Sequence, residues 1–221
     1  SLTLSLVSNS SNFTSTNTGI DNATSGVVQL TAADITALGI SANVGDFFIY
    51  SLGFDGLDDT ETATATFNVI LSDGTAPVTS TVTLTVNGVN DAPTVVAAPA
   101  TTLSETDFAT LSGYENAYKI ITETEMYAIL GANDVDVNDS LTLSLVTDSS
   151  NFTSSNAGID NTTSGVVQLT AADITALGIT ANVGDFFIYS LGFDGLNASE
   201  TSTATFNVIL SDGTAPVTST V

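Results

Sequence analysis

Apolar residues alternate with serine and threonine along much of this chain, and this period-two pattern is typical of half-buried β-strands. The opening run, Ser-Leu-Thr-Leu-Ser-Leu-Val, shows it clearly, and Phe67, Val69 and Leu71 fall on one face of a later segment. Clusters of Gly, Asn, Asp and Ser separate these runs and indicate turns. In the first half of the chain the pattern predicts strands at residues 1–7, 27–30, 47–52, 62–71 and 79–86.

One segment departs from this alternation and has the signature of a short helix. Thr31 precedes Asp34 by three residues, as in a capping box, and Gly39 follows a short apolar stripe. We therefore expect a helix of about two turns here. The preceding residues 9–25 are rich in Ser, Thr, Asn and Gly and are expected to form a long loop.

The chain repeats itself without a gap. Residues 1–82 align with residues 140–221, and 72 of the 82 aligned pairs are identical. A repeat of this length suits a whole small domain rather than a solenoid unit, so it indicates tandem modules. We expect residues 1–91 to be the C-terminal part of one module and residues 92–221 to be a second module without its closing strand. On this interpretation the chain is a window from a longer array, unless a neighbouring chain supplies the strand.

The segment between the two copies occurs once. Within it, residues 95–102 and 126–130 are predicted as strands. Residues 104–119 stay ambiguous, because Ser104 can cap a short helix there. Many short strands, frequent turns and one short helix per repeat predict an all-β fold of tandem sandwich modules.

The charge balance excludes several classes of partner. The sequence has 24 Asp and Glu residues against one basic residue, Lys119, and it contains no His or Cys. Such a surface repels nucleic acid and anionic membranes, since Lys and Arg are what bind phosphate groups. The absence of cysteine excludes disulfides and thiolate zinc sites. No apolar run approaches the roughly 20 residues that span a bilayer, so we expect no membrane insertion.

The residue types present do not favour catalysis. Without His, Cys or Arg, carboxylates, hydroxyls and one amine remain for acid–base or nucleophilic roles. Asp58, Asp59 and Glu61 are candidates for a glycosidase pair, but the second copy has Asn197 and Ala198 at the first two positions. A paired-acid mechanism would not differ so much between near-identical modules, so we expect no enzyme.

Oxygen ligands are concentrated around the junction of the modules and favour calcium. Ca²⁺ takes about six to eight oxygen ligands and accepts carboxylates, Asn amides and carbonyls. Alternation points the carboxylates of Asp134 and Asp136 the same way, and a turn can bring Asp139 into reach. The alternative is that such acids are solvated turn residues, and Asp55, Asp58 and Asp59 are left open between the two interpretations. The residues expected to bind Ca²⁺ are Asp73, Asn90, Asp91, Glu105, Glu123, Asp134, Asp136, Asp139 and Asp212.

Several motifs in combination make the chain resemble a known family. An Asn-Asp-Ala-Pro linker occupies residues 90–93, Ser-Asp-Gly turns occupy 72–74 and 211–213, and a D-x-D-x-x-D-x-L-x-x-S-L run spans 134–145. With the closing strand that leads into the linker, the chain resembles the tandem immunoglobulin-like, cadherin-like repeats of giant bacterial surface adhesins, including the RTX type. The resemblance implies an Ig-like β-sandwich, and it implies nothing about residues 9–44, their copy in the second repeat, or residues 104–125.

The resemblance and the oxygen ligands together give an expected function. We expect a structural extender module of a large extracellular adhesin or surface filament, at the cell surface, rigidified by Ca²⁺ at the inter-repeat linker. Its expected partners are adjacent repeats of the same chain and, by strand addition, neighbouring copies. The alternative is an adhesive module whose long loops, residues 9–25 and 148–164, bind a glycan or a protein. Threonine alternation also permits ice binding, but it is typical of an ordinary exposed strand face.

Overall fold

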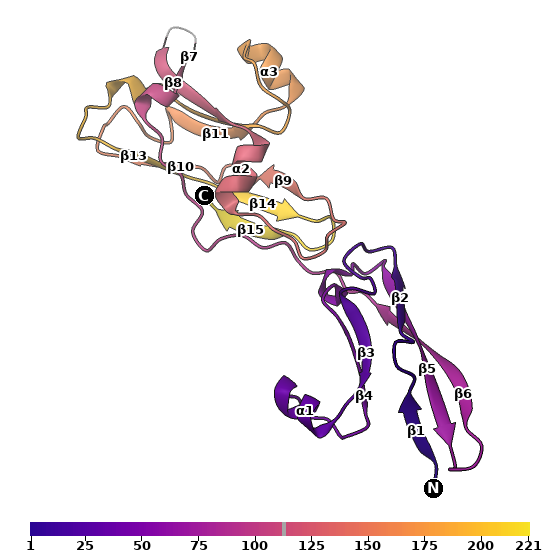
Figure 1. The fold of residues 1–221 in the computed structure, drawn as a ribbon. Coiled ribbons are helices and arrows are strands. Elements are labelled where there is room, and N and C mark those ends of the chain that lie inside the picture. The colour runs from indigo at the N-terminus through magenta and orange to yellow at the C-terminus, as the bar shows by residue number, and fades with distance from the viewer. Residues whose placement is uncertain (112–113) are drawn as a thin grey trace. The chain divides into compact units, whose positions relative to one another are not determined.

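The computed structural model describes residues 1–111 and 114–221, and it is mostly β-structure with a few short helices (Figure 1). Its strands form several antiparallel sheets. The chain divides into two compact units, the first made of residues 1–91 and 135–139 and the second of residues 92–134 and 140–221. The all-β class expected from the alternating pattern is therefore confirmed.

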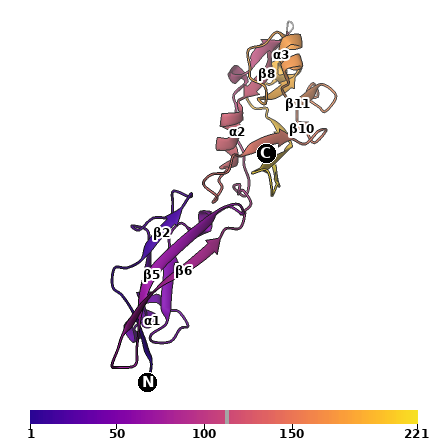
Figure 2. The same cartoon turned by 90° about the vertical axis from the view of Figure 1, so that its right-hand side faces the viewer.

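The first unit is built around the long strand β5 (Thr62–Ser72). One edge of β5 pairs antiparallel with β6 (Val78–Asn87), and the two strands lie side by side along their length (Figure 2). The other edge pairs with β2 (Asn12–Ser15) and, further along, with β1 (Thr3–Leu6). The residues of β5 that are buried alternate with more exposed ones, as the threonine pattern predicts: Ala63, Ala65, Phe67 and Val69.

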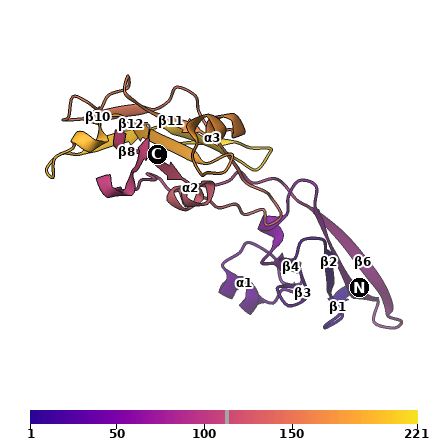
Figure 3. The same cartoon turned by 90° about the horizontal axis from the view of Figure 1, so that it is seen from above.

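A two-stranded sheet completes the first unit. β3 (Ser25–Gln29) pairs antiparallel with β4 (Phe47–Ser51), and α1 (Ala32–Leu38) lies in the connection between them (Figures 1 and 3). The 3-10 helix η1 (Phe54–Gly56) then leads toward β5. The buried core cluster contains Phe13, Ile20, Val27, Leu57, Ala63, Ala65, Phe67 and Val69.

The second unit repeats these sheets. β14 (Asn207–Ser211) pairs with β15 (Val217–Thr220) on one edge and with β9 (Thr142–Leu145) on the other. β10 (Asn151–Ser154) pairs with β13 (Ser202–Thr205), so β13 and β14 together correspond to β5.

The other sheet of the second unit is larger than its counterpart in the first. β11 (Ser164–Gln168) and β12 (Phe186–Ser190) correspond to β3 and β4, and β12 also pairs with β8 (Tyr114–Ile121), which pairs with β7 (Ala109–Leu111). The remaining helical segments of this unit are α3 (Ala171–Leu177), η2 (Glu105–Asp107) and η3 (Phe193–Gly195). The core cluster contains Ile121, Met126, Leu130, Leu143, Phe152, Ile159, Val166, Phe186, Ile188, Phe193, Phe206, Val208 and Leu210.

The structure corrects the elements expected in the segment that occurs once. The strand predicted at residues 126–130 is wrong, because these residues lie in the helix α2 (Glu123–Leu130). Thr122 and Glu125 form a capping box at its start, and Gly131 ends it in the left-handed conformation with φ 56°. The strand predicted at residues 95–102 is also absent, and an isolated bridge between Thr94 and Asn133 is found beside it.

The helix expected at Thr31 is confirmed in both copies. Thr31 and Asp34 form the capping box of α1, Thr170 and Asp173 form that of α3, and glycine ends each helix with φ 64°. The loop expected at residues 9–25 is interrupted by β2. No helix within residues 1–111 and 114–221 is long and apolar enough to cross a bilayer.

Candidate metal centre

The turn that leads into β5 gathers three acidic side chains of the first unit. The N–H of Glu61 donates to the carbonyl of Asp58 (2.9 Å), and the carboxylate of Glu61 accepts from the N–H of Asp58 (3.2 Å). The carboxylate of Asp58 accepts from the N–H of Thr60 (3.2 Å). These reciprocal bonds hold Asp58, Asp59 and Glu61 on one tight turn.

The chain that follows β6 runs along this turn. The N–H of Gly88 donates to the carbonyl of Glu61 (3.0 Å), and the N–H of Val89 donates to the carbonyl of Leu57 (3.0 Å). A Cβ atom at position 88 would lie 2.0 Å from the carbonyl oxygen of Asp58. Glycine is therefore required for the close approach that carries the chain toward Asp91.

Residues 135–139, which belong to the same unit, bring a buried carboxylate to this turn. Asp136 is 2% exposed, and its carboxylate accepts a hydrogen bond from the N–H of Asp91 (2.6 Å). The side-chain amide of Asn138 donates to the carboxylate of Glu61. We call Asp58, Asp59, Glu61, Asp91 and Asp136 the Asp136 cluster.

A buried amide orients Glu61 from within the unit. Asn17 is 2% exposed, and its amide nitrogen donates to the carboxylate of Glu61 (3.0 Å) and to the carbonyl of Gly56. Its amide oxygen accepts from the N–H of Gly19 (2.9 Å). Because every polar atom of this side chain is used, Asn17 fixes the position of the Glu61 carboxylate.

Two carboxylates of the Asp136 cluster, Asp58 and Asp59, have shifted pKa values. A hydrogen bond with Asp58 and the negative charge of Asp58 raise the pKa of Asp59, and the charge of Asp136 raises it further. The same hydrogen bond lowers the pKa of Asp58. A cation held among these oxygens would favour the charged form of each of them. Oxygens are the ligands that a hard divalent cation prefers. Among the described residues, however, no three carboxylates of this cluster have oxygens within 4.8 Å of one another.

A second group of carboxylates consists of Asp134, Asp139 and Asp212. One carboxylate oxygen from each residue lies within 4.8 Å of the other two. Asp212 lies in the turn after β14, where its carboxylate accepts from the N–H groups of Thr214 (2.6 Å) and Ala215 (2.7 Å). Three carboxylate oxygens at this spacing can also hold a hard divalent cation.

Asp73, which was expected at the linker, lies far from it. Its carboxylate accepts from the N–H groups of Thr75 (2.8 Å) and Ala76 (3.1 Å) in the β5–β6 turn. Glu61 immediately precedes the opposite end of β5, and the 11 residues of that strand, at about 3.3 Å each, separate the two acids by more than roughly 30 Å. The structure therefore does not bring Asp73 together with Asp91. Its counterpart Asp212 is the turn acid that meets other carboxylates.

Of the remaining expected ligands, one lies at the linker and two lie in helices of the second unit. The side-chain amide of Asn90 donates to the carbonyl of Asp91 (2.9 Å), beside the Asp136 cluster. Glu123 begins α2, about 12 Å of helix before Asp134, and accepts from the hydroxyl of Tyr127 (3.4 Å). Burial, followed by the charge of Glu123, raises the pKa of Tyr127 to about 12. Glu105 lies in η2 and borders a cavity of the second unit rather than the acidic residues.

The sequence reasoning missed Glu61 as a member of this site, although the repeat contains a signal for it. Glu200, the counterpart of Glu61, accepts from the N–H of Asn197 (2.8 Å) in the same kind of turn. The two acids beside Glu61 are replaced there by Asn197 and Ala198. Residues 58–60 all differ from their counterparts, and this is the longest run of differences between the copies, so it marks the first turn as special.

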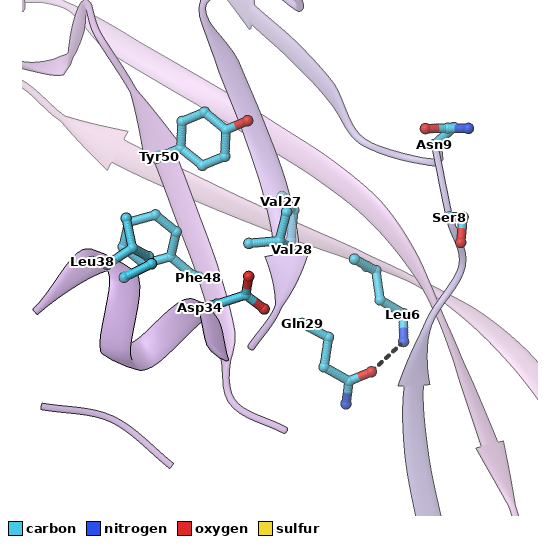
Figure 4. A pocket seen from close by; sticks show the side chains of 11 residues that line it. Leu6, Ser8, Asn9, Val27, Val28, Gln29, Asp34, Leu38, Phe48 and Tyr50 are labelled. Carbon is cyan, nitrogen blue, oxygen red and sulfur yellow. Dashed lines mark hydrogen bonds between the residues drawn. The ribbon is translucent and has the colours of Figure 1, made fainter. Parts of the chain in front are cut away.

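The first unit also has an open hollow between α1 and the β3–β4 pair, with a volume of about 710 Å³ (Figure 4). Val28, Phe48 and Tyr50 line it from the sheet, and Asp34 and Leu38 line it from the helix. The carboxylate of Asp34 accepts from the N–H (2.8 Å) and hydroxyl (2.6 Å) of Thr31, which completes the capping box. Among its lining residues, no second carboxylate accompanies Asp34, so the hollow offers no paired-acid chemistry.

The long loops use their polar side chains internally. The carboxamide oxygen of Asn22 accepts from the N–H of Phe13 (2.7 Å), and its nitrogen donates to Asn12 (3.0 Å). The carboxylate of Asp21 accepts from the N–H groups of Ala23 (2.8 Å) and Thr24 (2.9 Å). These bonds shape the loop from within.

Comparisons with known proteins add no relative. No protein-family model matches the chain, and no significant match is found among the curated proteins or the solved structures.

Proposed function

We propose that this chain is a structural extender module of a large extracellular adhesin or surface filament, rigidified by Ca²⁺ at the linker between repeats. The observation that carries the proposal is the buried carboxylate of Asp136 bonded to the N–H of Asp91 beside the Glu61 turn. Hydrogen bonds thus bring together the Glu61 turn, the N–H of Asp91 and the segment 135–139, which are distant in sequence, where the linker begins.

The chemistry of the donor set favours calcium over other cations. The sequence has no His or Cys, which are the ligands that zinc and other softer metals prefer. Mg²⁺ demands near-ideal octahedral geometry, whereas Ca²⁺ accepts six to eight oxygens in flexible arrangements. A mixed set of carboxylates, asparagine amides and backbone carbonyls therefore suits Ca²⁺ better than Mg²⁺.

The mechanical role follows from where the ligands lie in the chain. Asp91 precedes residues 92–134 and Asp136 follows them, so a cation held by both joins the two ends of that segment. On this proposal each unit is an Ig-like β-sandwich, supported by the paired sheets around a common core in each unit. Calcium then restricts the motion of successive repeats, which keeps a long array extended.

Calcium removal tests this function. Extracellular modules commonly bind Ca²⁺ with a Kd of about 0.1–1 mM. At calcium about a hundredfold above Kd, one site adds about 2.7 kcal/mol to the free energy of unfolding. Adding EDTA should therefore lower the melting temperature and increase flexibility in small-angle scattering, while Mg²⁺ restores neither. An unchanged melting temperature and an unchanged scattering profile would contradict the proposal.

A further inference from the structure

The strands β4 and β12 have identical sequences but different neighbours. β12 pairs with β11 along one edge and with β8 along the other. β4 pairs with β3, and no other strand of residues 1–111 and 114–221 pairs with it. One edge of β4 is therefore open in the first unit, whereas the equivalent edge of β12 is covered by β8.

The backbone groups of this open edge can be assigned from the ladder. The N–H of Leu30 donates to the carbonyl of Asp46 (2.8 Å), and the N–H of Leu52 donates to the carbonyl of Thr24 (3.1 Å). Because hydrogen-bonding direction alternates along an antiparallel strand, the N–H and C=O groups of residues 47, 49 and 51 face away from β3. Their counterparts in β12 face β8, where Phe186 is opposite Ile121 and Ile188 is opposite Lys119.

The helix that follows β8 covers an apolar surface that is open in the first unit. Met126 and Leu130 of α2 are fully buried and belong to the same core cluster as Leu143 and Leu210, which are 7% and 0% exposed. The counterparts of these two leucines in the first unit, Leu4 and Leu71, are 47% and 43% exposed. The exposed surface therefore matches the apolar face of α2.

Two polar and aromatic contacts add specificity to this match. At the start of α2, the N–H of Glu123 donates to the carboxylate of Asp185 (3.1 Å), which is buried, whereas its counterpart Asp46 is exposed. The ring of Tyr118 stacks on Phe187 with centroids 5.0 Å apart. Among the ring pairs of the described residues, Phe48, the counterpart of Phe187, occurs only in a stack on Tyr50, with centroids 5.7 Å apart.

We propose that the open edge of β4, together with Leu4, Leu71 and Asp46, binds a further copy of the β8–α2 segment carried by another repeat of this type. The added strand lies antiparallel to β4, with its Ile121 opposite Phe47 and its Lys119 opposite Ile49. Addition of a strand to an exposed edge is an established mode of recognition, and here main-chain bonds and the buried helix face act together. The interaction goes beyond the proposed calcium function and does not depend on the cation.

A synthetic peptide of residues 117–131 tests the docking surface. It is added to the full chain in EDTA, and amide hydrogen exchange is followed residue by residue. Exchange at Phe47, Ile49 and Ser51 should slow toward the rates of their β12 counterparts, while Phe48 and Tyr50, already bonded to β3, change little. The amides of β12 serve as an internal control, because β8 already covers them.

Two further samples make the result decisive. A peptide carrying Ile121→Asp and Met126→Asp has lost both buried anchors and should leave exchange unchanged. A fusion that places residues 92–139 directly before Ser1 supplies the segment in the same chain, with Asp139 preceding Ser1 as it precedes Ser140. Slower exchange at residues 47, 49 and 51 with the unmodified peptide or in the fusion supports the proposal, and unchanged exchange in both overturns it. Because EDTA is present throughout, neither outcome bears on calcium binding.

Discussion

Glu61 and Glu200 occupy equivalent positions of the repeat and differ in the charge around them. Glu61 shares its turn with two aspartates and accepts from the amide of Asn138. At the turn of Glu200 those aspartates are replaced by an asparagine and an alanine. Substituting each glutamate therefore distinguishes two effects. At Glu200 only a charge in a turn is lost, whereas at Glu61 a proposed metal ligand is lost as well.

We expect Glu61→Gln to weaken calcium binding and Glu200→Gln to leave it unchanged. Loss of one carboxylate from the Asp136 cluster should reduce affinity roughly tenfold, which is about 1.4 kcal/mol. Calorimetric titration of the full chain with Ca²⁺ measures both variants under the same conditions. Equal losses of affinity in the two variants would remove Glu61 from the site.

The protonation of Asp59 gives a second test at this scale. Asp58 and Asp136 raise the pKa of Asp59 above its ordinary value of 3.8. With a raised folded-state pKa, the contribution of Asp59 to stability is present below its unfolded pKa and is lost as pH rises through the folded value. Bound Ca²⁺ favours the carboxylate, so adding it should lower the pKa of Asp59 in an NMR titration. A pKa that does not respond to Ca²⁺ would place the ion elsewhere.

At the scale of elements, α2 differs from the other capped helices because residues of the helix that its cap begins are buried in the core. Thr122 caps it, and two residues on its buried face are completely inaccessible to solvent. α3 has an equivalent capping box at Thr170 but no buried residue. The same local motif therefore has different consequences in the two helices.

We expect Thr122→Ala to destabilise the second unit by about 1 kcal/mol, the typical effect of losing an N-cap. Thr170→Ala should fray α3 without a comparable change in the unfolding midpoint, as measured by chemical denaturation. The backbone and side chain of Thr122 lower the pKa of Glu125 from 4.5, so its stabilisation is present above pH 4.5 and is lost as pH falls through the folded pKa. Thr122→Ala should weaken that acid dependence. Equal effects of the two substitutions on the unfolding midpoint would contradict this assignment.

The contrast between α2 and β5 indicates what could be predicted from sequence alone. Alternation located β5, because its side chains report directly which face is buried. It also located β6, although no residue of that strand is buried. The apolar run of α2 was mistaken for a strand, although Thr122, Glu125 and Gly131 already carried the signals of a helix start and stop. Short apolar runs are ambiguous by periodicity, and the caps decide between the alternatives.

The candidate site was predictable only in part for a similar reason. Asp91 and Asp136 lie in motifs that can be recognised in the sequence, and the structure brings the two residues together. Glu61 joins them through hydrogen bonds between residues distant in the chain, for which no local pattern exists. Asp73 has the same local motif as Asp212, and only the arrangement of the strands separates their surroundings.

At the scale of the whole molecule, two nearly identical sequences have unequal cores. The cluster of the second unit includes residues of β8 and α2, for which the first unit has no equivalent. Leu4 and Leu71 remain about half exposed as a result. Since burying a leucine side chain fully contributes about 1.5–3 kcal/mol, these two positions alone separate the units by roughly 1–2.5 kcal/mol.

We therefore expect the two units to unfold separately in calcium-free buffer, the first at the lower temperature. For units of this size, 1 kcal/mol shifts the melting temperature by about 4–8 °C, so the transitions should be roughly 5–20 °C apart. Amide exchange at rising temperature distinguishes them, since Phe48 and its counterpart Phe187 report on the same position of each unit. Calcium should then reduce the difference between the two melting temperatures. The reason is that the Asp136 cluster belongs to the first unit, and binding stabilises only the unit that forms the site. A single transition without calcium, or a first unit that outlasts the second, would contradict the inferred difference in packing.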